Sequence, residues 1–552
     1  DMAERCGISS RLAQLLWLRG IDDREQLAEY LSPGLRYLAR PSLWPGIEKA
    51  ADILARGLRE GRKLAVWGDY DADGVTSTAL VLQVLRHYGY EAMWHLPDRR
   101  EEGYGMNEAG VERLAEQGVT LLLTVDCGIS DVAAIARARE LGMEVVVTDH
   151  HLLPEELPDA AVLCNPKLAD CPCASLSGVG VTFFLMAELN ARLAEGGAPR
   201  FDMRRTLDLV ALGTLADLVE LEGQNRILVK NGLLVIGEAK RPGISELKVV
   251  CGFAPLASLG AGQVIFSLAP RINAAGRVAS AETALELLCA GDCDTAADLA
   301  RRLDGYNTQR RQEEERITEE AMLQAEASLN DPALVIAGTD WNQGVIGIVA
   351  SRLVEKYHKP TLVLCTDGET LKGSGRSISG FDMHDGLARC AGDLESFGGH
   401  RMAAGVRVRP ERLEAFRRHF FEVVREVLGP DPVPAVQLID GELDFKEASN
   451  FIFLKELEMM QPFGVGNPEP VFQSPPLLVK RRRLFGQQKN HVLLELTDES
   501  CNITLQAKAW RQAEQFPADL EGRRIRLAYS PGIDMYNGAA SVDVRIRDWK
   551  LV

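Results

Sequence analysis

Short apolar runs alternate with amphipathic helical stretches between residues 47 and about 221, and this alternation constrains the fold more than any other feature. The runs recur about every 25–30 residues, as in βαβ units. We predict five strands, at residues 64–67, 92–95, 119–125, 144–148 and 160–164. Parallel strands of this kind form one sheet covered by helices, and ligands bind at the edge where their carboxyl ends lie.

The first predicted strand is followed by an acidic run, Asp69-Tyr70-Asp71-Ala72-Asp73-Gly74. Three carboxylates on alternate residues repel one another unless a cation lies among them, and hard divalent cations prefer carboxylate oxygen. The spacing also matches the start of a calcium-binding loop. That loop needs a preceding helix and a Glu at its twelfth position, where this chain has Leu80. The strand-like run before the carboxylates therefore favours a ligand site at a strand end.

Further candidate metal ligands follow the next strands. Asp126 ends the third strand, His150 follows the fourth, and Asp217 ends an otherwise apolar stretch, where a carboxylate is costly unless neutralised. The predicted ligands are Asp69, Asp71, Asp73, Asp126, His150 and Asp217. Five carboxylates and one imidazole match two ions roughly 4 Å apart that share a bridging carboxylate. Mixed oxygen and nitrogen ligands favour Mn²⁺ or Mg²⁺ over zinc, and attack of water on phosphorus is the predicted chemistry.

The chain divides into five predicted parts. Residues 1–45 form an N-terminal helical segment, and 46–290 form the α/β domain with the metal ligands. Residues 291–330 hold dense charge and no Pro, which predicts a long linking helix. A second α/β domain spans 331–430, and 431–552 combine a Pro-rich linker with short strand-like runs typical of a small barrel. The predicted class is α/β, with a parallel-sheet catalytic domain and a second α/β domain joined by a long helix, plus a C-terminal OB-like β-barrel.

Charge is unevenly distributed along the chain. The 552 residues carry a net charge of −17, whereas residues 476–552 hold 13 Lys/Arg against 9 Asp/Glu. The basic side chains gather at Lys480-Arg481-Arg482-Arg483, with Phe485 and Lys489 beyond them. This run is compatible with a local phosphate-binding surface. A solvated strand edge protected by its charge has the same composition and is, for the run taken alone, the commoner case.

Cysteine and hydropathy patterns bear on the compartment. The 11 cysteines are odd in number and scattered, which argues against a disulfide framework, and Cys171 and Cys173 lack the distant partners of a zinc site. No apolar stretch reaches the roughly 20 residues that span a bilayer. The first residues, Asp1 to Arg5, lack the basic and apolar regions of a signal peptide. We therefore expect a cytoplasmic protein.

Several motifs resemble a known family. Similarity to the phosphoesterase superfamily named for its Asp-His-His motif lies in the acidic run, in Val125-Asp126-Cys127-Gly128-Ile129-Ser130 and in Asp149-His150-His151. The RecJ family of bacterial single-stranded-DNA exonucleases is resembled by Gly178-Val179-Gly180-Val181, by residues 207–217 and by Pro270-Arg271-Ile272-Asn273-Ala274-Ala275-Gly276-Arg277. Its associated domain is resembled by Lys372-Gly373-Ser374-Gly375-Arg376-Ser377 and Phe397-Gly398-Gly399-His400. Two positions depart from the family pattern, Ala269 replacing Gly and Asn342 replacing His.

The resemblance, which covers about residues 45–475, implies roles for the matching positions. The six ligands would hold two metal ions with Asp126 as the bridge, and the catalytic residues would be Asp73, Asp126 and His151, the last contacting the scissile phosphate. The substrate would be bound by Arg271, Asn273, Arg277, Ser374, Gly375, Arg376, Gly399 and His400. Within this set Ser374 to Arg376 would hold a 5′ phosphate through loop amides and a guanidinium.

The implied activity is metal-dependent 5′→3′ hydrolysis of single-stranded DNA to mononucleotides in DNA repair and recombination. Expected partners are single-stranded DNA, a single-strand-binding protein and a repair helicase, and no membrane. Two alternatives stay open from the residues. One is a phosphodiesterase for oligoribonucleotides or cyclic dinucleotides, which needs no long grip on its substrate. The other is a non-catalytic replication scaffold, which should have lost ligands.

Overall fold

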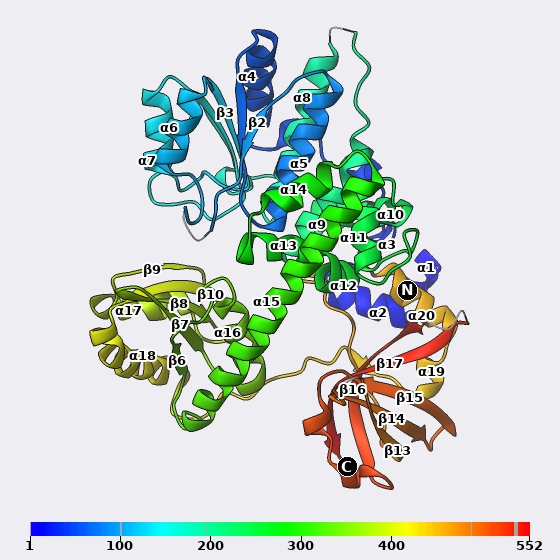
Figure 1. Cartoon of the computed structure of the whole chain (residues 1–552). Coiled ribbons are helices and arrows are strands. Elements are labelled where there is room, and N and C mark those ends of the chain that lie inside the picture. Colours follow the sequence, from blue (N-terminus) through cyan, green and yellow to red (C-terminus); the bar gives the residue numbers. More distant parts are fainter. Residues whose placement is uncertain (1, 100–101, 196, 487, 535–538) are drawn as a thin grey trace.

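The chain folds into three β-sheet bodies that are connected through helices (Figure 1). The computed structural model describes residues 2–99, 102–195, 197–486, 488–534 and 539–552. Among these residues, no helix has both the length and the apolar character needed to cross a membrane.

The first body contains the predicted parallel sheet, with strand order β2-β1-β3-β4-β5. Its strands are β1 (Leu64–Trp67), β2 (Met93–His95), β3 (Leu121–Val125), β4 (Glu144–Thr148) and β5 (Val162–Cys164). All neighbouring pairs are parallel. Because β1 and β3 are buried along their whole length, they read as continuous apolar runs.

Helices cover both faces of this sheet. One face packs on α4 (Ile47–Arg59), α5 (Ala72–His87) and α8 (Gly178–Ala194). The other face packs on α6 (Glu108–Glu116) and α7 (Val132–Glu140), in a separate core that contains Trp67. Because helices cover both faces of the sheet, the edge at the carboxyl ends of its strands is the part that remains accessible to ligands.

A helical layer follows the sheet along the chain. It comprises α9 (Leu207–Asp217), α10 (Gly223–Glu238), α11 (Pro242–Val250), α12 (Ala261–Gln263), the π-helix η5 (Val264–Leu268), α13 (Ala269–Val278) and α14 (Glu282–Cys289). Helix α9 packs against α5, α8 and α10 and is buried up to Leu215. Its carboxyl end carries Asp217.

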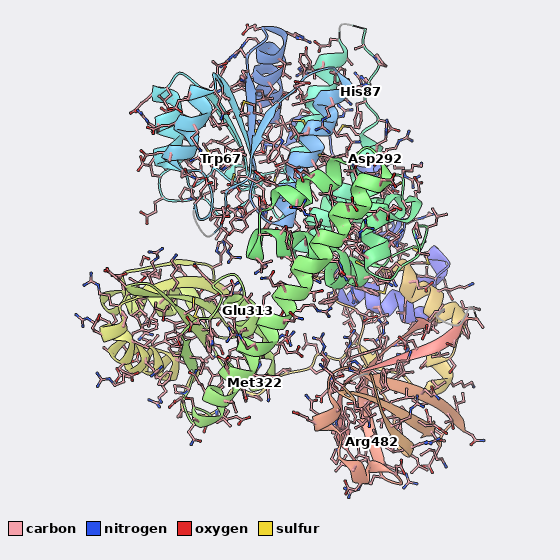
Figure 2. All side chains as sticks on the ribbon, in the orientation of Figure 1. Trp67, His87, Asp292, Glu313, Met322 and Arg482 are labelled. Atoms are coloured by element: carbon pink, nitrogen blue, oxygen red, sulfur yellow. The ribbon has the colours of Figure 1, made fainter. Side chains whose placement is uncertain are left out.

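A single 35-residue helix, α15 (Cys293–Ala327), connects the first body with the second. In Figure 2, Asp292 lies at its start beside the first body and Met322 lies beside the second, with Glu313 between them. The buried Glu314 is 2.6 Å from Arg310 on the same helix and also pairs with Arg352 of the second body. These pairs attach the second body to α15.

The second body is a mixed sheet with strand order β6-β7-β8-β10-β9. Its strands are β6 (Leu334–Gly338), β7 (Thr361–Asp367), β8 (Thr370–Arg376), β9 (Ser396–Gly399) and β10 (Ala403–Val408). One face packs on α17 (Met383–Arg389) and α18 (Leu413–Leu428). On the other face, α15 and α16 (Ile346–Tyr357) share a core with β6 and β7.

The third body is a closed five-stranded barrel, as predicted. It is formed by β13 (Leu477–Phe485), β14 (His491–Asp498), β15 (Ile503–Ala509), β16 (Arg524–Asp534) and β17 (Ser541–Leu551). Strand β16 pairs with both β13 and β17, and β15 pairs with β17, so the sheet closes. Two short strands, β11 (Gly441–Glu442) and β12 (Phe472–Gln473), extend it along β16.

The N-terminal helices pack on this third body. Helices α2 (Ser10–Leu18) and α3 (Arg24–Leu31) share its core with α19 (Phe445–Ala448) and α20 (Phe451–Met459), whereas α1 (Met2–Cys6) contacts α2. Arg226 of α10 is buried where these parts meet the first body. Its guanidinium donates to the carbonyls of Tyr30, Met460, Gln461 and Pro462. The barrel is thereby fixed to the first body.

Candidate functional site

The carboxyl edge of the parallel sheet brings the six predicted ligands together. Asp69, Asp126 and His150 follow β1, β3 and β4 at neighbouring positions of this edge. Asp217 reaches them from the end of α9. We call Asp69, Asp71, Asp73, Asp126, His150 and Asp217 the acidic centre.

Two sets of ligand atoms can be distinguished in the acidic centre. Asp69, Asp71 and Asp126 offer oxygens that lie within 4.8 Å of one another, and Asp73, His150 and Asp217 do the same. The Asp126 Oδ1 atom is 3.2 Å from His150 Nε2 and so lies against both sets. Asp126 also has a φ of 61°, a left-handed conformation that is uncommon for non-glycine residues but that Asp adopts more readily than most.

The electrostatics of the acidic centre call for cations. Burial, followed by repulsion from neighbouring carboxylates, raises the pKa of Asp69, Asp73 and Asp126 well above the usual range. Burial lowers the pKa of His150 to about 4, which keeps its imidazole neutral. Asp69 Oδ1, Asp126 Oδ1 and His150 Nε2 are buried and make no hydrogen bond with the described residues. Unpartnered oxygens and a neutral nitrogen are the donor set that Mn²⁺ and Mg²⁺ accept.

Backbone amides hold two of the carboxylates in place. Asp71 caps α5 through Oδ1, which accepts from Asp73 N at 2.9 Å and Gly74 N at 3.1 Å. Asp73 accepts from Gly178 N at 2.8 Å and Val179 N at 2.9 Å, at the start of α8. Amides at a helix start favour the charged carboxylate. The start of α8 can also lie close to Asp126 because Gly178 has no side chain. A Cβ at Gly178 would lie 2.3 Å from Asp126 Oδ1.

His151 lies beside the acidic centre and is oriented by Asp149. Asp149 Oδ1 accepts from His151 Nδ1 at 2.7 Å and from its backbone N at 3.0 Å, while Oδ2 accepts from Ile129 N. Burial opposes a charge on His151, but its hydrogen bond to Asp149 and the nearby carboxylates raise its pKa to about 9. The Tyr104 hydroxyl lies 3.1 Å from the same Nδ1. Neither Asp149 nor Tyr104 is among the catalytic, metal-binding or substrate-binding residues predicted from the sequence.

Helix α13 carries three predicted substrate-binding residues, Arg271, Asn273 and Arg277, and only the last two lie toward the site. Asn273 Oδ1 accepts from Ala72 N at 2.8 Å, beside the acidic run. Arg277 is partly buried and donates to Gly344 O of the second body at 2.8 Å. Arg271 points elsewhere, because it pairs with Asp304 of α15 at 2.8 Å and donates to Ser267 O. Two positions before Asn273, Arg271 lies on another side of the helix, and its contact with substrate stays a prediction.

A pocket of about 480 Å³ lies between the first and second bodies. We call it the interdomain pocket; its lining includes Arg99, Arg277, Gln343, Gly347, Lys372, Ser374, Arg376 and Gly399. Arg376 Nη1 donates to Ser374 Oγ at 3.1 Å. Repulsion from Arg99 adds to burial in lowering the pKa of Arg376. Concentrated positive charge of this kind matches an anion such as a phosphate.

Two predictions about the second body need correction. Ser374 to Arg376 were expected to form a loop with free amides, but they lie in β8, which pairs with β7 and β10. Gly375 faces Leu362 and Met383 in the core, because successive residues of a strand point to opposite faces. Gly399 lines the interdomain pocket, and His400, half exposed, lies near enough to His151 for repulsion to contribute to lowering its pKa. Asn342, the unexpected residue, accepts from Gly344 N at 2.8 Å in a turn.

Three lining residues with charged or amide side chains were not predicted from the sequence. Arg99 follows β2, so the strand-end argument that found the carboxylates also applies to it. Lys372 begins the motif that contains Ser374 and Arg376, and it lies on the same face of β8 as both. Gln343 lies next to Asn342 and carries no sequence signal that we recognise.

Family models match three parts of the chain. The N-terminal domain of the DHH family matches residues 63–214, the DHHA1 domain 330–426 and the RecJ OB domain 439–548. The single-stranded-DNA-specific exonuclease RecJ of Bacillus subtilis is 35% identical, with 99% of this chain and 69% of that protein covered. The Escherichia coli protein of the same name is 38% identical over 91% of this chain and 89% of its own length.

A solved structure shares the whole architecture. The crystal structure of RecJ from Thermus thermophilus in complex with Mn²⁺ matches this chain with a TM-score of 0.84 at 31% identity. The match covers 100% of this chain and 77% of that one. A second structure, of an exonuclease RecJ bound to manganese, gives a TM-score of 0.62 at 34% identity, covering 71% of this chain and 97% of the other.

Proposed function

The chain belongs to the RecJ family of single-stranded-DNA-specific exonucleases, and from this premise we propose that it removes mononucleotides from the 5′ end of single-stranded DNA with two divalent metal ions. The observation that carries the proposal is the adjacency of two sites. The acidic centre offers two sets of ligand atoms, and the basic interdomain pocket opens between its domain and the next.

Asp69, Asp71 and Asp126 would hold one ion and Asp73, His150 and Asp217 the other, with Asp126 contacting both. The chemistry that such Mn²⁺ or Mg²⁺ ions supply when bound is Lewis-acid activation of water and neutralisation of charge at phosphorus. The unpartnered oxygens of Asp69 and Asp126 fit this assignment.

His151 and Arg277 would act on the phosphate itself. Asp149 fixes the His151 ring, whose pKa of about 9 keeps it protonated at neutral pH, so that it can donate to an oxygen of the scissile phosphate. Arg277 carries its charge between the acidic run and the second body. Asn273 fixes the backbone at Ala72 and so positions the carboxylates on either side of it.

The interdomain pocket supports the 5′ polarity. Ser374, Arg376, Arg99 and Arg277 offer a hydroxyl and three guanidiniums to a terminal phosphate. A terminal phosphate bound there would place the next phosphodiester toward the acidic centre, so that one nucleotide is removed at a time.

The barrel supports a long single-stranded substrate. Phe485, His491 and Trp510 form a cluster of rings with centroids 4.9–5.2 Å apart, and Trp510 is 52% exposed. Gln488, in the turn beyond the basic run, contacts Glu315 of α15 at 3.4 Å. Exposed rings among basic side chains are a stacking surface for unpaired bases. A dinucleotide phosphodiesterase would have no use for this surface, and a scaffold would have no use for six intact ligands.

A labelled single strand tests the proposal. With Mn²⁺, the wild type should release labelled mononucleotide at once from a 5′-labelled strand and only late from a 3′-labelled one. Asp126→Ala should lose this activity, whereas Asp159→Ala, a matched change at an exposed carboxylate of the same domain, should keep it. Equal activity of wild type and Asp126→Ala would refute the metal assignment, and faster turnover of a dinucleotide than of a long strand would favour the alternative phosphodiesterase. A role in DNA repair and recombination, a cytoplasmic location, and recruitment by a single-strand-binding protein and a repair helicase remain predictions.

A further inference from the structure

The interdomain pocket continues into a second hollow on the open face of the second sheet. This hollow has a volume of about 440 Å³ and shares Arg99, Gln343, Lys372, Gly373 and Gly405 with the interdomain pocket. Beyond the shared residues it is lined by Glu102, Gly103, Ser396, Phe397, Gly398, Val406 and Arg407. We call it the outer groove.

Strand register explains the shape of the outer groove. Ser374 of β8 lies opposite Gly405 of β10, and Gly405 lies opposite Gly398 of β9. The next row on the same face joins Lys372, Arg407 and Ser396. Two residues along a strand advance about 7 Å, so this row of small residues separates Arg376 from Arg407 and from Lys372, which lines both hollows.

The floor of this small row is open. A Cβ added at Gly398 would meet nothing within 4 Å, and one at Gly405 would meet only carbonyl oxygens at 3.9 and 4.0 Å. Neither glycine has a positive φ. The space above them therefore comes from missing side chains and not from an unusual backbone.

The charge of the outer groove is positive. Among the described residues that line it, Arg99, Lys372 and Arg407 contribute three cations against one carboxylate, that of Glu102. Glu102 Oε2 already accepts from His95 at 2.9 Å and from Asn107 at 2.8 Å. An anion that extends from the interdomain pocket along the small row would meet Lys372 and Arg407 next.

We propose that the outer groove binds the outer phosphates of a strand with a 5′ di- or triphosphate, with Arg407 and Lys372 as the specificity-determining residues. This inference rests on the proposed function, because it takes the interdomain pocket as the site of the first 5′ phosphate. The groove then lets the enzyme accept polyphosphorylated 5′ ends and not only monophosphates.

Two variants test the inference against one substrate pair, a single strand with a 5′ monophosphate and the same strand with a 5′ triphosphate. Arg407→Ala should lower kcat/KM for the triphosphate end by about tenfold and leave the monophosphate end unchanged, since each charged contact accounts for about one order of magnitude. Gly398→Leu, which adds a side chain at a position where a Cβ would meet nothing within 4 Å, should do the same. Arg389→Ala, a matched loss of an exposed arginine that pairs with Glu426, should change neither substrate.

Binding without turnover provides a second readout. In EDTA, fluorescence anisotropy should show tighter binding of the triphosphate strand by the wild type and equal binding of both strands by Arg407→Ala. Rejection of the triphosphate end by a wild type that degrades the monophosphate end would overturn the inference and leave the proposed function intact. Equal losses on both ends in the two variants would also overturn it, since that result is expected of a product exit path. A wild type that degrades neither strand would refute the proposed function itself.

Discussion

The acidic centre and the interdomain pocket are built in opposite ways. The acidic centre belongs to one domain, is mostly buried and carries an excess of negative charge. The interdomain pocket is open, positive and assembled from the first body, β8 and β9. The first therefore depends on local chain geometry at the ends of strands. The second depends on where α15 places the second body. Mutations should separate these two dependencies.

The largest effect is expected at Gly178, where the start of α8 contacts the acidic centre. Gly178→Ala would place a Cβ 2.3 Å from Asp126 Oδ1 and push the carboxylate from both sets of ligands. We expect exonuclease activity to fall by about a thousandfold, since misplaced ligands lose several kcal/mol of transition-state stabilisation.

Gly347→Ala is the matched change at the interdomain pocket. Its Cβ would lie 2.9 Å from Ser374 Oγ and 3.1 Å from an Arg376 nitrogen, both of which are side-chain atoms that can move. The loss of exonuclease activity in Gly347→Ala should be much smaller than in Gly178→Ala. Mn²⁺ should also raise the melting temperature of Gly347→Ala by more than it raises that of Gly178→Ala. Similar losses in both variants would contradict the distinction between a rigid centre and an adjustable pocket.

The second effect concerns the residue that supports His151. Asp149→Asn keeps the shape but removes the charge that holds the His151 pKa near 9. Activity should fall by about 10- to 100-fold, as for other residues that orient a metal-site group. Because a lower His151 pKa means that the imidazole loses its proton at lower pH, the alkaline limb of the pH–rate profile should shift to lower pH. A uniform loss at every pH would show that Asp149 acts on structure alone.

The third effect is specific to the interdomain pocket. Arg376→Ala should reduce kcat/KM for a 5′-phosphorylated strand by about tenfold and leave a 5′-hydroxyl strand nearly unchanged, because only the former loses a charge-assisted contact. Arg417→Ala, in α18 on the other face of this sheet, serves as the control. An equal loss on both strands would place Arg376 outside terminal recognition.

The smallest effect is expected far from both sites, on the barrel. Trp510→Ala removes an exposed ring from the cluster with Phe485 and His491, and base stacking on an aromatic ring contributes about 1–3 kcal/mol. Binding of a long single strand, measured by anisotropy, should weaken by about tenfold, while hydrolysis of a strand too short to reach the barrel should not change. A loss on the short strand would show that Trp510 supports the fold instead.

The two sites also differ in how well the sequence predicted them. The strand ends at Asp69, Asp126 and His150 were predictable because a short apolar run followed by a polar residue fixes the strand and its end together. That Arg271 faces Asp304 and that Gly375 faces the core was not predictable, because a motif does not say which of its residues share a face. Arg99 was missed although it also follows a strand, because a single arginine in a loop carries no pattern of its own.

The sequence by itself determined the parallel sheet, the long connecting helix, the barrel and the identity of the six residues in the acidic centre. These follow from local periodicity and from the cost of placing like charges together without a cation. Only the tertiary structure decided which arginines face the interdomain pocket, that the glycine row opens into an outer groove, and that the N-terminal helices pack on the barrel. Those features depend on contacts between segments that are not neighbours in the sequence, whose relative position no local pattern encodes.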